Sequence, residues 1–89
     1  MKLILAIVSA DAVDPVSTAL VERKYSVTQI SSVGGFLRRG SSTLVIGVEE
    51  KLVQEALTAI RAACAHFTKA EGGHAATIFV LDAAQFIQI

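Results

Sequence analysis

The sequence predicts an α+β fold in which two helices pack on one face of a four-stranded antiparallel sheet. The chain of 89 residues is long enough for one domain, residues 1–89. Four short runs of apolar and β-branched residues alternate with two segments whose apolar residues recur at steps of three and four. These segments follow one another in the order β-α-β-β-α-β, which favours the ferredoxin-like sandwich with an antiparallel sheet.

The first strand and the first helix occupy the N-terminal quarter of the chain. Leu3–Val8 is a continuous apolar run, typical of a strand buried on both faces. The run resembles the core of a signal peptide but is shorter than the roughly 7–15 apolar residues such a core needs, so we interpret it as structure. Asp11–Lys24 is predicted to be a helix, with Asp11 or Asp14 as its N-cap and Pro15 in its first turn.

The middle of the chain predicts a hairpin. Ser26–Val33 has the β-branched residues of a strand, although polar side chains fall on both of its faces. After the glycine-bounded stretch "GGFLRRG", Ser42–Val48 is a second strand-like run.

The C-terminal half predicts a long helix followed by the last strand. Glu49–Phe67 carries apolar residues at helical spacing and begins with two glutamates, which suit the positive end of a helix dipole. Lys69–His74 is a short loop, and Ala76–Leu81 is an apolar strand. We expect Ala83–Ile89 to add one turn and a short strand.

Apolar residues are more abundant than a small monomer can bury. They make up 53 % of the chain, against 18 % charged residues. The strands Leu3–Val8, Ser42–Val48 and Ala76–Leu81 are apolar on both faces, and two helices cover only one face of a sheet. A closed homo-oligomer is therefore predicted.

Charge and chemistry exclude several classes of function. The formal net charge is zero, which argues against binding a nucleic-acid polymer, and no run is long enough to insert into a membrane. A single cysteine, Cys64, is consistent with a reducing compartment. The spacing of Cys64, His66 and His74 matches no zinc signature, and no nucleophile stands beside a base. We therefore predict no catalytic residues, no metal, no cofactor and no enzymatic activity.

The glycine-bounded loop is the strongest candidate for ligand binding. It is not a Walker-type loop, because the lysine is missing and a strand follows it where a helix is needed. One interpretation is a hairpin turn with solvated arginines. The other is an anion nest in which Arg38 or Arg39 holds phosphate, Phe36 and Leu37 cover a nucleobase, and Thr28 offers a hydroxyl.

Three segments carry a resemblance to a known family. "MKLILAIV", "SVGGFLRRGSSTLVIGV" and "GGHAATIFVLDAAQFIQI" resemble the PII-like cyclic-di-AMP receptors, signal transduction proteins related in form to the PII nitrogen regulators. The resemblance implies a cytoplasmic, ferredoxin-like homotrimer that binds cyclic di-AMP in clefts between subunits and signals to a downstream protein that the sequence does not identify. The alternative is a trimeric interaction module that binds another nucleotide or none. A small intersubunit enzyme is a further rival.

The family's ligand contacts can be carried over to this chain position by position. They are Thr28, Gly35, Phe36, Leu37, Ser41, Gly47 and Gln88, with Lys24 and Arg38 as possible phosphate contacts. Ser26 and Ser41 stand where family members have an arginine and an asparagine. Lys69–His74 is also much shorter than the family's loop at that place, which leaves the transmission of the signal open.

Overall fold

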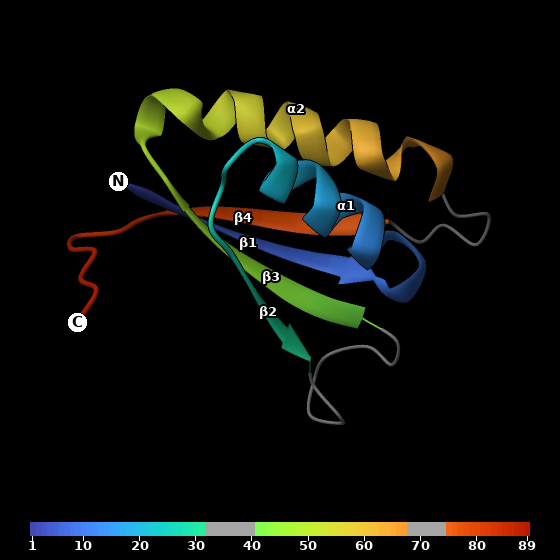
Figure 1. Ribbon diagram of the computed structural model, residues 1–89, viewed down its shortest axis with the longest axis horizontal. Coiled ribbons are helices and arrows are strands. Elements are labelled where there is room, and N and C mark those ends of the chain that lie inside the picture. The colour runs from blue at the N-terminus through green and yellow to red at the C-terminus, as the bar shows by residue number, and fades with distance from the viewer. Residues whose placement is uncertain (32–40, 68–74) are drawn as a thin grey trace.

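The computed structural model describes residues 1–31, 41–67 and 75–89, and it forms a sheet with two helices on one face (Figure 1). The four strands are antiparallel and lie in the order β2-β3-β1-β4. This confirms the α+β prediction and is compatible with a ferredoxin-like fold. The strands are β1 (Lys2–Ser9), β2 (Val27–Ser31), β3 (Ser41–Val48) and β4 (Ala76–Asp82); the helices are α1 (Ala10–Glu22) and α2 (Val53–Cys64).

The two central strands, β1 and β3, organise the sheet. Leu5 of β1 lies opposite Val45 of β3 on one side and opposite Phe79 of β4 on the other. Thr28 of β2 also pairs with Val45, which confirms the predicted hairpin between β2 and β3. Because opposed residues share a face, this register fixes which side chains lie together across all four strands.

The start of α1 differs from the prediction. The helix begins at Ala10 with Ser9 as N-cap, so Asp11 lies in the first turn and Asp14 in the interior. Pro15 is inside the helix and not in its first turn. Proline has no N–H, so position 15 cannot donate the helical hydrogen bond that the Asp11 carbonyl would otherwise accept. The strand β1 runs directly into the helix, and this continuity outweighs the local preference for an aspartate cap.

The end of α1 is closed by a Schellman motif. The Tyr25 N–H donates to the Leu20 carbonyl at 3.1 Å, and the Lys24 N–H donates to the Val21 carbonyl at 2.9 Å. Lys24 has a φ of 71°, in the left-handed region that usually requires glycine. A lysine therefore holds a strained backbone at the turn that leads into β2.

The C-terminal half corrects two predictions. The expected helix Glu49–Phe67 divides into a 3₁₀ turn at Glu50–Leu52, the helix α2, and a second 3₁₀ turn at Ala65–Phe67. Residues 83–89, which we call the tail, form no helix or strand, although a turn and a strand were expected. Short apolar segments like this one satisfy several patterns equally well, and contacts decide among them.

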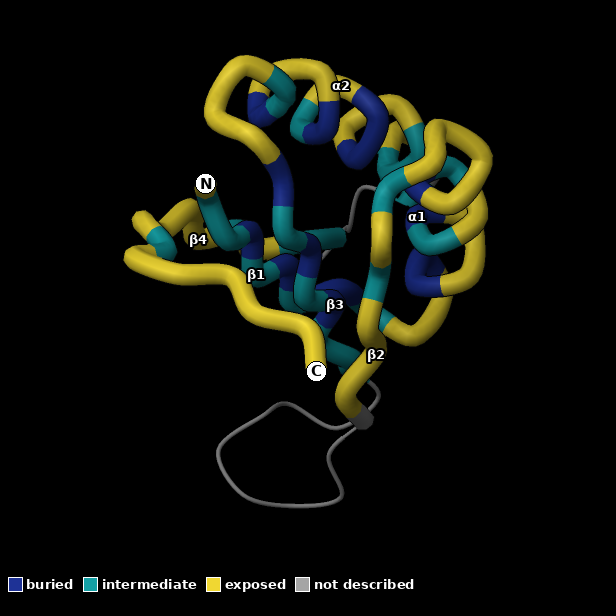
Figure 2. Tube along the Cα trace, turned by 60° about the vertical axis from the view of Figure 1, so that its left-hand side comes forward, coloured by how far each residue is buried: buried dark blue, intermediate teal, exposed yellow. Residues whose placement is uncertain are grey.

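The core lies between the helices and the central strands (Figure 2). From Ile4 to Val8 in β1 and from Leu44 to Val48 in β3, every second residue is buried, which is the two-residue period of a strand packed on one face. Buried positions in the helices follow a three- and four-residue step. The buried apolar residues are Ile4, Ala6, Val8, Ala12, Val13, Val16, Leu20, Leu44, Ile46, Val48, Val53, Ala56, Ala59 and Ile60.

Candidate functional site

The side of the sheet opposite the helices, which we call the open face, carries a continuous set of apolar side chains. The register places alternate residues of β1, β3 and β4 there. Two of them, Phe79 and Leu81, are 51 % and 45 % exposed. A sheet with one apolar face left this open favours contact with another molecule. The apolar members of the open face are Leu3, Leu5, Ile7, Ile30, Val45, Phe79 and Leu81.

Two predicted ligand contacts, Thr28 and Gly47, lie close together on the open face. Thr28 is exposed and opposes Val45, and Gly47 is two residues further along β3. Two residues of an antiparallel strand span about 7 Å. Ser26 comes just before β2, whose first residue pairs with Ile46, so it lies at the same end of the sheet. The hairpin register therefore groups Ser26, Thr28 and Gly47.

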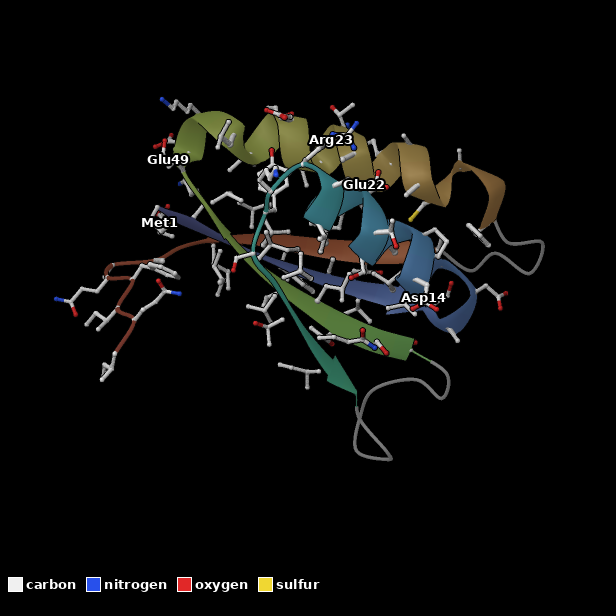
Figure 3. The ribbon with its side chains drawn as sticks, viewed as in Figure 1. Met1, Asp14, Glu22, Arg23 and Glu49 are labelled. Atoms are coloured by element: carbon white, nitrogen blue, oxygen red, sulfur yellow. The ribbon has the colours of Figure 1, made fainter. Side chains whose placement is uncertain are left out.

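Phe86 of the tail covers Gly47 and was not among the predicted site residues. A Cβ on Gly47 would lie 3.5 Å and 3.7 Å from two carbons of the Phe86 ring. The tail leaves β4 beside Met1, labelled in Figure 3, and the Ala83 N–H donates to the Met1 carbonyl at 3.1 Å. An aromatic residue two positions before Gln88 was the only signal in the sequence.

Ser41 lies at the opposite end of β3 from Gly47. It pairs with Ser9, whereas Gly47 pairs with Leu3. Gly47 is six residues further along the strand than Ser41, which is about 20 Å. One chain therefore does not bring Ser41 to the group at Gly47.

The remaining predicted residues divide into two groups. Lys24 is exposed in the link between α1 and β2, and Gln88 is exposed in the tail two residues beyond Phe86. Gly35, Phe36, Leu37 and Arg38 lie outside the described residues, as does the whole predicted loop Lys69–His74.

One ion pair closes the sheet at its Gly47 end. Lys2 and Asp82 are opposed on β1 and β4, and their side chains hydrogen-bond. This bond raises the pKa of Lys2 and lowers the pKa of Asp82. The pair is exposed to solvent, so it contributes little to the free energy of folding.

Two further groups have perturbed pKa values because they are partly buried. Burial, with the nearby Glu55 carboxylate second, raises the pKa of Tyr25. Burial also raises the pKa of the Cys64 thiol, which packs against the core as a protonated group. Neither group has the lowered pKa that marks an activated nucleophile.

The described residues contain no group of three or more His, Cys, Asp or Glu side chains that would hold a metal ion. In the same parts of the chain, no helix has the length and hydropathy needed to cross a membrane.

The fold and the polar group on the open face define a small α+β protein that carries candidate ligand-binding residues on the side of its sheet away from the helices. A family model described as a cyclic-di-AMP receptor matches residues 1–72. The chain belongs to this family. The family consists of receptors, not of a known class of enzymes, and membership supports signalling through a bound nucleotide.

A solved structure has the same architecture over nearly the whole chain. It is the crystal structure of a functionally unknown protein from Pediococcus pentosaceus ATCC 25745, 29 % identical in sequence. The match covers 99 % of this chain and 96 % of that chain, with a TM-score of 0.78. The shared fold therefore includes β4 and the tail, which the family model does not reach.

Proposed function

We propose that this protein is a cytoplasmic, homotrimeric signalling receptor that binds cyclic di-AMP in the clefts between its subunits. Family membership supports the ligand. The open face supports the assembly, because it exposes apolar side chains of β1, β3 and β4 that a second and third copy would bury. A downstream protein then reads the occupied state, and no catalytic step is required.

The observation that carries the proposal is the separation of the candidate contacts. Gly47 lies near one end of β3 and Ser41 at the other, about 20 Å away, and Thr28 of β2 opposes Val45, about 13 Å along β3 from Ser41. A cyclic dinucleotide contacts both groups most simply where one end of a subunit's β3 faces the other end of a neighbour's. A cleft between subunits provides that arrangement.

Each described candidate has a role that suits its chemistry. The Thr28 hydroxyl is exposed on the open face and both donates and accepts hydrogen bonds. The Gln88 amide matches the donor and acceptor edge of adenine. Lys24 offers a cation for a phosphate, which compensates in part for the uncharged Ser26.

The proposal is tested by isothermal titration of the purified protein with cyclic di-AMP, with cyclic di-GMP and ATP as competing nucleotides. We expect saturable binding of one cyclic di-AMP per subunit and three subunits per particle by light scattering. Thr28→Ala is expected to weaken binding about threefold to tenfold, the value of one hydrogen bond. Thr18→Ala, at a threonine of α1 that is also exposed, serves as the matched control and should bind as the native chain does.

A gain of affinity gives the converse test. Ser26→Arg restores the arginine of the family, and a charge-assisted contact to phosphate should tighten binding roughly tenfold to a hundredfold. A monomeric native protein contradicts the cleft, and a native trimer that ignores cyclic di-AMP contradicts the ligand. Selective binding of another nucleotide would point to the alternative module.

A further inference from the structure

The contact between Phe86 and Gly47 joins the tail to the open face. The ring lies where a Cβ added to Gly47 would meet it at ordinary van der Waals distance, 3.5 Å and 3.7 Å, so a methyl group fits between the backbone and the ring. On the same face of β3, the next position carries Val45, and across the sheet Gly47 opposes Leu3. A glycine between larger side chains leaves a recess, and the Phe86 ring lies over it.

The backbone does not require glycine at this position. The φ of Gly47 lies outside the left-handed region, so other residues can adopt its conformation. A small residue here admits the ring, and an alanine Cβ would meet it only at ordinary van der Waals distance. A larger side chain at Gly47 would meet the aromatic carbons and displace the tail.

The rest of the tail is loosely held. Ala83 is fixed by its hydrogen bond to Met1, and beyond it the chain has no helix or strand. Ile87 is 69 % exposed, whereas Phe86 is 55 % exposed although it is larger. Phe86 is thus a second point of attachment, and the two points define the path of the tail along the open face (Figure 2).

We propose that Phe86 is a positioning residue that anchors the tail on Gly47 and so places the Gln88 amide at the nucleotide site. The inference rests on the proposed function, because Gln88 has this role only where a nucleotide binds. Gln88 is two residues beyond the anchor, at most about 7 Å of chain. Without the anchor, binding would have to order the whole segment from Ala84 onward, and that ordering opposes affinity.

A double-mutant cycle tests whether Phe86 acts through Gln88. Cyclic di-AMP is titrated into the native trimer, Phe86→Ala, Gln88→Ala and the double variant. We expect a loss of about threefold to tenfold for each single variant, and no further loss for the double variant beyond Gln88→Ala alone. Phe86→Leu, which keeps an apolar side chain, should recover part of the affinity, and Ile87→Ala serves as the exposed neighbouring control.

NMR measures the anchor without any nucleotide. Cross-peaks between the Phe86 ring and the Gly47 α-protons are expected in the native protein and in Gly47→Ala, but not in Gly47→Leu. In Phe86→Ala, the amide signals of Ile87, Gln88 and Ile89 should move to random-coil positions.

The outcomes separate the two claims. Affinity losses that multiply in the double variant, or native affinity in Phe86→Ala, overturn the positioning role while the receptor function stands. Missing cross-peaks in the native protein overturn the anchor itself. If cyclic di-AMP fails to bind the native protein while the cross-peaks are present, the proposed function fails, and the role of Gln88 fails with it.

Discussion

The two faces of the sheet use the same strands and differ in what covers them. On the helix side, Ile4, Leu44 and Ile46 are completely buried. On the open face, their neighbours Leu5 and Val45 are half-buried and Phe79 is 51 % exposed. Residues of similar hydropathy therefore contribute differently, since an apolar side chain stabilises the fold in proportion to the area it removes from water. The helix side is completed within one chain, and the open face is not.

On the helix side, side chains are less buried on the edge strand β4 than on the central strands. Ile78 is half-buried and Val80 is 42 % exposed, although both share a face with the buried residues of β1. The buried core residues come from the helices and from the central strands β1 and β3, and none comes from β4. The difference shows that the position of a strand in the sheet, as well as the face a residue lies on, decides how much the residue contributes to stability.

The largest expected effect comes from the same substitution on each face. Leu44→Ala opens a cavity under the helices and should lower the free energy of unfolding by about 2–5 kcal/mol. Leu5→Ala removes a half-buried side chain and should cost roughly 1 kcal/mol in the isolated subunit. Urea denaturation followed by circular dichroism measures both.

Protein concentration makes this comparison sharper. If other copies cover the open face, Leu5→Ala should also weaken the dependence of unfolding on protein concentration, measured at concentrations about a hundredfold apart. Leu44→Ala should shift both curves equally. Equal losses in the two variants at every concentration would contradict the distinction between the faces.

An intermediate effect is expected at the turn between the helical layer and the sheet. Lys24→Gly relieves the left-handed backbone at φ 71° and should raise the free energy of unfolding by about 1 kcal/mol. Lys24→Ala removes the same charge but keeps a Cβ, so it should bring no such gain. Thermal melts of the two variants separate backbone strain from packing on either face, and a gain in both variants would point to charge instead.

The smallest expected effect on stability comes from the Lys2–Asp82 pair, which lies at an end of the sheet that the helices leave exposed to solvent. The lowered pKa of Asp82 adds stability above its ordinary value of 3.8, and this is lost as the pH falls toward the folded-state value. The raised pKa of Lys2 adds stability below 10.5, lost as the pH rises above it. Asp82→Asn should flatten both limbs of the pH profile of stability, measured in low salt.

Salt provides the control for this last comparison. Since Asp82 is 82 % exposed, high ionic strength should remove most of the difference between Asp82→Asn and the native chain. A difference in stability that persists in high salt would show that the Lys2–Asp82 pair is more shielded from solvent than the exposure of Asp82 indicates.

The strands were predictable because their signal is local. Continuous apolar runs place β1, β3 and β4 within one or two residues of their observed bounds. The N-cap of α1 was not, because Ser9 stands at that position in place of Asp11 or Asp14, and Pro15 lies inside the helix. Packing against the sheet sets where a helix begins, and it outweighs the preference of a single residue.

The sequence predicted which residues belong to the candidate site but not how they are arranged in space. The hairpin explains why Thr28 and Gly47 are close, and the length of β3 explains why Ser41 is not. Phe86 was missed because the tail has no regular structure, so no helical or strand periodicity in the sequence predicts its contact with Gly47. Contacts between segments about 40 residues apart depend on the path of the chain.

The sequence by itself determined the order of helices and strands, the excess of apolar residues and the absence of a catalytic pattern, since all three follow from local periodicity and composition. Only the tertiary structure decided which alternate residues face the helices, how far the candidate contacts lie apart, and that the Phe86 ring rests on Gly47. The physical reason is that strand register and tail packing are set by long-range contacts, whose free energy depends on the whole fold.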